Sequence, residues 1–192
     1  MGVIIDQIKS WDQSLFLWLN GAHNGLLDFL MPWFSDKYIW IPLYAFLLYL
    51  LWKHHRAQLL YVLIGLGLLI FISDQVASGL LKPWVERLRP CYEPALEGQV
   101  RVLKGCGGRY GFASSHASNS FAAAIFCWLM LRPYVKHIYW IIPWAVIVAY
   151  SRIYLGVHYP VDIFMGALIG WGAARFVYFL FNKITHAKTP KA

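Results

Sequence analysis

Two histidines in this sequence stand beside residues that could direct acid–base or nucleophilic chemistry. His158 is followed four residues later by Asp162, with Pro160 between them at the expected start of a helix. A carboxylate one helical turn away can hold one imidazole nitrogen and leave the other nitrogen free to attack an electrophile. A His–Asp pair can also be a structural helix cap, so this spacing alone leaves both interpretations open.

His116 closes a second polar cluster, Ala113-Ser114-Ser115-His116, which precedes an apolar stretch. Small residues at a helix N-terminus leave backbone N–H groups unpaired, and such groups bind anions. The hydroxyls of Ser114 and Ser115 would add donors, and His116 can supply a proton near neutral pH. The serines by themselves would equally suit an ordinary N-cap.

Three cations accompany these clusters: Lys82, Arg89 and Arg152. Arginine offers a planar fork that matches two phosphate oxygens, and lysine offers a point charge. If they converge, they would hold a phosphate dianion and the charge that develops in its transition state. A single basic residue near a helix end commonly contacts lipid headgroups instead. Three of them beside histidine and serine clusters favour a phosphate site.

Other charged residues and cysteines receive more ordinary interpretations. No set of His, Cys, Asp and Glu has the spacing of a metal site, so no metal or other cofactor is expected. Asp74 is expected to pair with Lys82 or Arg89, and Arg87 to be a solvated loop charge. Cys91 and Cys106 share one polar loop and would form a disulfide in an oxidising compartment, but their spacing does not decide the pairing.

The composition places these clusters in a membrane protein. Apolar residues make up 59% of the 192 residues and charged residues 14%, against roughly 25% charged in a soluble domain. The net charge of +8 is divided among short clusters between apolar runs, so nucleic-acid binding is not expected. A span takes about 20 mostly apolar residues, and five stretches qualify directly or with flanking residues. These are Ile39–Trp52, Gln58–Leu81, Phe121–Leu131, Ile138–Tyr150 and Ile163–Phe181.

Five spans would put all three polar clusters on one membrane face. The opposite face would carry only basic charge, which favours the cytoplasm there. We expect one membrane domain over residues 1–192, with interfacial helices in 1–36, a core in 37–182 and a basic tail in 183–192. In the first helix Trp11, Leu15 and Trp18 share one side and Asp12 the other, which is typical of an interfacial helix. Residues 15–35 could instead span the membrane.

Together the three clusters resemble the signature of the type 2 phosphatidic acid phosphatase (PAP2) superfamily, which shares a helical core with vanadium haloperoxidases. That signature is Lys, six residues, Arg-Pro; then Pro-Ser-Gly-His; then Ser-Arg, five residues, His, three residues, Asp. Its first and third parts match here in full, and in the second Ala113 and Ser115 replace proline and glycine. The matching residues are Lys82, Arg89, Pro90, Ser114, His116, Ser151, Arg152, His158 and Asp162. The resemblance covers roughly residues 55–182.

The resemblance implies an all-α membrane bundle with a metal-independent phosphatase site. His158 would form a phosphohistidine, Asp162 would orient it, and His116 would protonate the leaving oxygen and later activate water. Phosphate would be bound by the remaining motif residues, Lys82, Arg89, Ser114 and Arg152, with the backbone of Ser115.

The substrate implied by this resemblance is a lipid phosphate or diphosphate held in the bilayer. Undecaprenyl diphosphate ranks first, and lipid A or phosphatidylglycerophosphate and phosphatidic acid are the alternatives. A haloperoxidase-like enzyme is disfavoured by the five expected spans, and a transporter would not explain two histidines and an aspartate on one face. We expect a bacterial inner-membrane enzyme with its site facing the periplasm or exterior; the sequence does not indicate an oligomeric state.

Overall fold

The computed structural model describes residues 2–186, with side chains from residue 6 onward, and these residues form helices and loops without a β-sheet. The all-α prediction is confirmed. The longer helices are α1 (Gly2–Gly21), α2 (Gly25–Phe34), α3 (Ile41–His54), α4 (Leu59–Asp74), α6 (Ser115–Leu131), α7 (Ile141–Tyr154) and α8 (Pro160–His186). A π-helical segment, η3 (Gln75–Leu81), joins α4 to the short α5 (Lys82–Val85). Single 3-10 turns are η1 (Lys37–Trp40), η2 (Arg56–Gln58), η4 (Pro90–Tyr92), η5 (Pro94–Leu96) and η6 (Ile138–Trp140).

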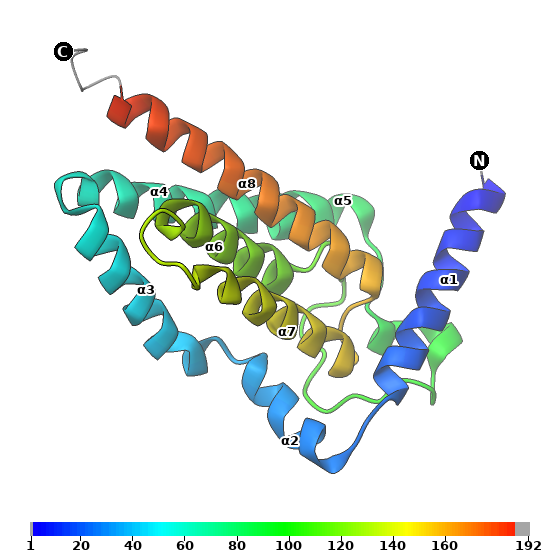
Figure 1. Cartoon of the computed structure of the whole chain (residues 1–192). Helices are drawn as coiled ribbons and strands as arrows, with labels where there is room; N and C mark the ends of the chain where they lie inside the picture. Colours follow the sequence, from blue (N-terminus) through cyan, green and yellow to red (C-terminus); the bar gives the residue numbers. More distant parts are fainter. Residues whose placement is uncertain (1, 187–192) are drawn as a thin grey trace.

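Helix α6 is the centre of the bundle (Figure 1). It packs against α4, α7 and α8, and α3 contacts it from the outer side. Its alanines allow this close packing, because Ala117, Ala122 and Ala124 have no exposed surface. Helix α8 approaches α6 still more closely at Gly170, where a Cβ atom would lie 2.8 Å from the backbone nitrogen of Ala122.

Two glycines of α8, Gly166 and Gly170, lie against α6. A third, Gly172, has open space around it. The difference follows from helical periodicity, since residues four apart share a face and residues two apart do not.

Two helical stretches of the described chain are long and apolar enough to cross a membrane, Arg56–Val85 and Pro160–Thr185. The other three predicted spans correspond to α3, α6 and α7, which have 14, 17 and 14 residues. These are shorter than the about 20 residues that a bilayer core requires. A membrane bundle is supported, while the number of five crossings stays a prediction.

The N-terminal segment forms two helices separated by a short break at residues 22–24. Helix α1 ends at Gly21, and Asn24 caps α2 by accepting a hydrogen bond from the backbone N–H of Leu27 at 2.9 Å. The apolar side of α1 is exposed, with Trp18 71% accessible. Asp12, assigned to the exposed polar side by the sequence pattern, is instead only 4% accessible, because it turns towards the start of α8.

The chain reverses direction at each long connection, so several helix ends meet at one end of the bundle (Figure 1). The start of α5, the start of α6, the end of α7 and the loop before α8 all border one cavity. The three polar clusters of the sequence are thereby brought together. The predicted tail extends α8 as far as His186, and residues 187–192 lie outside the described part of the chain.

Candidate active site

The shared cavity has a volume of about 640 Å³ and two chemically different parts. Its polar end is formed by six of the eight residues predicted for the site: Lys82, Arg89, Ser115, His116, Arg152 and His158. The rest of its wall is mainly apolar and comes from α3, α4, α6 and α7. A pocket of this kind can hold an anionic group at one end and an apolar group beside it.

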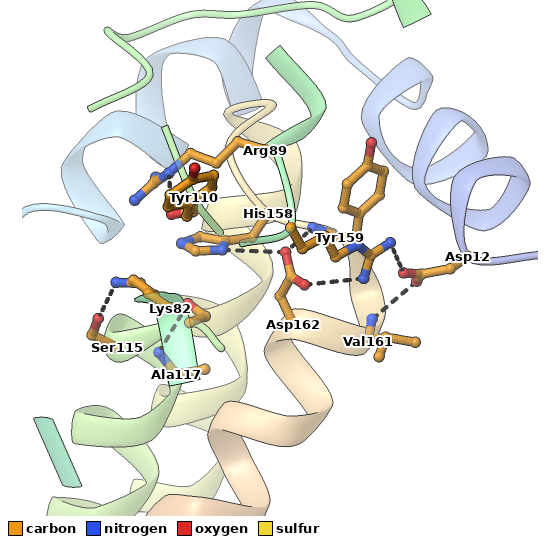
Figure 2. A network of polar contacts seen from close by, with 12 residues as sticks. Asp12, Lys82, Arg89, Tyr110, Ser115, Ala117, His158, Tyr159, Val161 and Asp162 are labelled. Carbon is orange, nitrogen blue, oxygen red and sulfur yellow. Dashed lines mark hydrogen bonds and ion pairs between the residues drawn. The ribbon is translucent and has the colours of Figure 1, made fainter. Parts of the chain in front are cut away.

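His158 lies in the loop between α7 and α8 with 1% of its surface accessible. Its Nδ1 atom lies 3.5 Å from Oδ2 of Asp162, which in turn accepts a hydrogen bond from the backbone N–H of Tyr159 at 3.0 Å. Figure 2 shows the other ring nitrogen pointing away from Asp162, towards the side of Lys82 and Arg89. Burial lowers the pKa of His158 to about 4 despite the nearby carboxylate, so the imidazole is neutral at pH 7.

His116 lies on the cavity wall in the first turn of α6. Desolvation by the surrounding cavity side chains and the positive charge of Arg152 lower the pKa of His116 to about 3. A bound phosphate would raise the pKa of His116 again, because an adjacent anion favours the protonated imidazole.

Ser114 and Ser115 differ in their relation to the cavity. Ser114 is fully buried and does not line it; its hydroxyl caps α6 by accepting from the backbone N–H of Ala117 at 3.5 Å. The hydroxyl of Ser115 accepts a hydrogen bond from Nζ of Lys82 at 2.7 Å and lies 2.6 Å from Oγ of Ser78. The structure therefore brings Ser115, but not the Ser114 side chain, to the place where an anion would bind.

The two arginines of the cavity are fixed by different segments. Arg89 is 8% accessible and donates from Nε to the backbone oxygen of Tyr110 at 3.2 Å. Burial lowers the pKa of Arg89 from its ordinary value. Arg152 donates to the hydroxyl of Ser35 at the end of α2, while its Nε atom has no hydrogen-bond partner among the described residues. Two oriented guanidinium groups and one ammonium group thus face a common space.

Comparison with known protein families identifies this arrangement. Residues 58–186, most of the chain, match the family model of the PAP2 superfamily. The chain belongs to the PAP2 superfamily. It is accordingly a hydrolase, a membrane phosphatase of the PAP2 type.

Individual relatives and a solved structure match between 77% and 95% of the chain. The lipid A 4'-phosphatase of Bacteroides thetaiotaomicron is 39% identical over 186 residues, which are 95% of this chain and 82% of the relative. The undecaprenyl-diphosphatase of Sulfolobus acidocaldarius is 33% identical over 148 residues, which are 77% of this chain and 65% of the relative. The crystal structure of Aquifex aeolicus LpxE is similar with a TM-score of 0.67 and 27% identity, covering 86% of this chain and 93% of that one.

Two charges of this PAP2 protein lie elsewhere than the sequence suggested. Arg87 is not a solvated loop charge, because its guanidinium contacts the carboxylates of Asp12 at 2.6 Å and Asp162 at 3.1 Å. Asp74 forms no ion pair with Lys82 or Arg89 in the described structure, and it accepts a hydrogen bond from Asn119 at 3.4 Å. Both predictions were wrong because sequence distance along a loop or helix does not fix which side chains meet.

The loop between α5 and α6 contains contacts that sequence reasoning missed. Leu88 and Tyr110 form an isolated antiparallel bridge, and the backbone N–H of Gly111 donates to the oxygen of Arg87 at 2.9 Å. Nearby, Cys91 and Cys106 are joined in a disulfide with their Cα atoms 6.4 Å apart, which resolves the pairing left open above. In the sequence, Gly111 was marked only by its position two residues before the Ala113-Ser114-Ser115-His116 cluster.

Proposed function

We propose that this PAP2 phosphatase hydrolyses a phosphate monoester of lipid A and releases inorganic phosphate. The observation that carries the proposal is the cavity, in which a cationic end and an apolar wall are continuous. The relative that is a lipid A 4'-phosphatase supports the substrate, since its similarity extends over 95% of this chain. A lipid whose phosphate lies at the membrane boundary and whose acyl chains stay apolar suits both parts of the cavity.

The apolar wall of the cavity is built mainly from aliphatic and aromatic side chains. Helix α3 contributes Tyr44, Leu47 and Leu51 to it, and α7 contributes Trp144 and Val148. Placing an acyl chain against them removes apolar surface from water, which stabilises binding by about 25 cal/mol for each Å² buried. The phosphate alone would be a weaker ligand, because it could use only the polar end.

In the proposed reaction, Nε2 of His158 attacks phosphorus while the bond to the lipid oxygen breaks. The electron pair of that bond stays on the leaving oxygen, and His116 gives this oxygen its proton. Asp162 stabilises the positive imidazole that results, as the carboxylate does in a catalytic triad. Water then attacks the phosphohistidine with His116 as general base, which releases inorganic phosphate and restores His158.

The cations would stabilise the charge that moves onto the phosphoryl oxygens during both steps. Lys82, Arg89 and Arg152 line the polar end of the cavity. Cationic side chains can provide the neutralisation that metal ions provide in other phosphotransferases. We therefore propose a metal-independent reaction, and the phosphate-release rate should be the same with and without EDTA.

Undecaprenyl diphosphate, ranked first from the sequence, takes second place. The undecaprenyl-diphosphatase relative is 33% identical over 77% of this chain, against 39% over 95% for the lipid A phosphatase. The two substrates also differ in the leaving group that His116 would protonate. For lipid A this group is a sugar hydroxyl, and for the diphosphate it is a lipid monophosphate.

A panel of purified lipids tests the substrate. The full chain in detergent should release phosphate from lipid A with a higher kcat/KM than from undecaprenyl diphosphate or phosphatidylglycerophosphate, and mass spectrometry should show the loss of one phosphate group. A higher kcat/KM for undecaprenyl diphosphate would overturn the lipid A assignment. His158→Ala protein, prepared in parallel, controls for contaminating phosphatases.

We further propose that the enzyme lies in a bacterial inner membrane with its site facing the periplasm. The disulfide between Cys91 and Cys106 lies in the loop at the site end, and disulfides persist in oxidising compartments. In spheroplasts, a membrane-impermeant maleimide should label these cysteines after impermeant reduction. With Cys91→Ser and Cys106→Ser in place, Lys136→Cys at the opposite end should stay unlabelled, and the reverse pattern would contradict this orientation.

A further inference from the structure

Arg87 forms a bridge between two carboxylates that come from opposite ends of the sequence. Its NH2 group donates to Oδ2 of Asp12 at 2.6 Å, and its NH1 group donates to Oδ1 of Asp162 at 3.1 Å. The guanidinium also lies over the ring of Tyr159, with Cζ 4.0 Å from the ring centroid. Arg87 does not line the cavity, so its charge acts on the far side of Asp162 from the substrate.

The two oxygens of Asp162 have separate partners. Oδ1 accepts from Arg87, whereas Oδ2 accepts from the N–H of Tyr159 and faces Nδ1 of His158. The Asp162 carboxylate has no accessible surface, and these three contacts fix its orientation. A buried carboxylate that loses its cation is strongly disfavoured and reorients or takes up a proton. The orientation of Oδ2 towards His158 thus depends on what holds Oδ1.

Asp12 determines the geometry and the net charge of this bridge. Its Oδ1 atom accepts from the backbone N–H of Val161 at the start of α8, and its Oδ2 atom accepts from Arg87 (Figure 2). Asp12 and Arg87 together are neutral. The negative charge of Asp162 therefore remains available to the imidazolium that forms when His158 is phosphorylated.

We propose that Arg87 is a positioning residue for phosphoryl transfer, which holds the Asp162 carboxylate towards His158 and is itself held and neutralised by Asp12 of α1. This inference rests on the roles proposed above for His158 and Asp162. It adds to the site a residue of the N-terminal helix, which precedes the segment 58–186 that matches the family model. Helix α1 is then part of the machinery that orients the nucleophile.

The steady-state kinetics of Arg87 variants of the full-length protein in detergent test this role. Arg87→Gln should lower kcat about tenfold or more and leave KM within about twofold, because the substrate does not contact Arg87. Arg87→Lys should recover part of kcat, since the ammonium keeps the charge but loses the fork that reaches both carboxylates. Asp12→Asn should also lower kcat with KM little changed.

A second ion pair provides a matched control. Arg101 binds both oxygens of Asp28 at 2.6 Å and so connects the α5–α6 loop to α2. This ion pair does not include Asp162. Arg101→Gln should keep kcat within about twofold of the wild type. If Arg101→Gln lowers kcat as much as Arg87→Gln does, the effect is general tethering of the N-terminal helices and the proposed role is wrong.

The decisive readout is the dependence on Asp162. In an Asp162→Asn background, adding Arg87→Gln should change kcat by less than about twofold, because the interaction it supports is already lost. A further loss of about tenfold in that background would show that Arg87 acts by another route. If Arg87→Gln is fully active while His158→Ala is inactive, only this inference falls. If His158→Ala is itself fully active, the proposed function falls instead.

Discussion

Gly111 lies so close to Asp162 that a Cβ atom added to it would stand 3.0 Å from the carboxylate Oδ2. The same atom would lie 3.2 Å from Cγ of Arg89 and 3.5 Å from Nδ1 of His158. Gly111 thus packs directly against the proposed nucleophile and its carboxylate. Its lack of a side chain is required by the two closest neighbours, Asp162 and Arg89, both of which are buried in a closely packed interior.

Gly111→Ala should therefore impair catalysis more than stability. Displacing the His158–Asp162 pair by a few tenths of an ångström should lower kcat about tenfold, since small misplacements of reacting groups are expensive in rate. Gly108→Ala on the same loop is the control, because a Cβ there meets no atom within 4 Å. Equal steady-state rates for the two variants would show that close packing of Gly111 against the His158–Asp162 pair does not matter for catalysis.

Substitutions of the His158–Asp162 pair should differ in severity. His158→Ala removes the nucleophile and should lower kcat about 10³-fold or more, with the protein still folded. Asp162→Asn leaves the imidazole in place but removes the orienting charge, so a smaller loss of about 10- to 100-fold is expected. Radiolabelled phosphoenzyme, trapped by an alkaline quench in which phosphohistidine is stable, should be absent from His158→Ala and present in Asp162→Asn; a labelled His158→Ala protein would assign the nucleophile elsewhere.

The pH dependence of kcat/KM should show an unusually low acid limb. The pKa of His158 is lowered to about 4, so its imidazole stays neutral, and able to attack, down to that pH rather than to the ordinary value of 6.5. Below about pH 4 protonation of His158 should lower kcat/KM about tenfold per pH unit, after correction for the separate titrations of the substrate phosphate and of His116, which the His116→Gln variant measures. In Asp162→Asn the limb should move lower, because Asp162 raises the His158 pKa.

Protein returned to pH 7 after exposure to each acidic pH should regain full activity, which separates titration from unfolding. A limb near pH 6.5 in the wild type would mean that His158 is not desolvated in the working enzyme.

Gly170 and Gly172 offer a matched test of the contact between α6 and α8. A Cβ at Gly170 would meet the backbone of Ser118 and Ala122, whereas one at Gly172 meets nothing within 4 Å. Gly170→Ala should destabilise the protein by about 1–3 kcal/mol through overpacking. Gly172→Ala should be neutral or stabilising by up to about 1 kcal/mol, because alanine favours the helix. Thermal unfolding in detergent measures both, and similar midpoints would contradict the packing described here.

Ser115 illustrates how a departure from a motif is understood only in three dimensions. From the sequence, serine in place of the motif glycine was expected to keep the backbone N–H and to add a hydroxyl donor for an anion. In the structure its hydroxyl contacts both Lys82 and Ser78, the latter from the π-helical segment η3. The π-helix changes the register of the residues that follow it, so regular α-helical spacing could not predict which side chain would meet Ser115.

The sequence by itself determined the helical class, the membrane character and the candidate reacting groups, because hydropathy and the order His–Asp, Ser–His and Lys–Arg are local properties of the chain. It could not determine the partners of Arg87, Asp12, Asp74 and Gly111. Those contacts join segments up to 149 positions apart, as between Asp12 and Val161. The packing of α1 and the α5–α6 loop against α8 creates the contacts of Asp12 and Arg87, and the packing of α4 against α6 creates that of Asp74. Local spacing indicated the candidate reacting groups, and tertiary packing decided how their side chains are held.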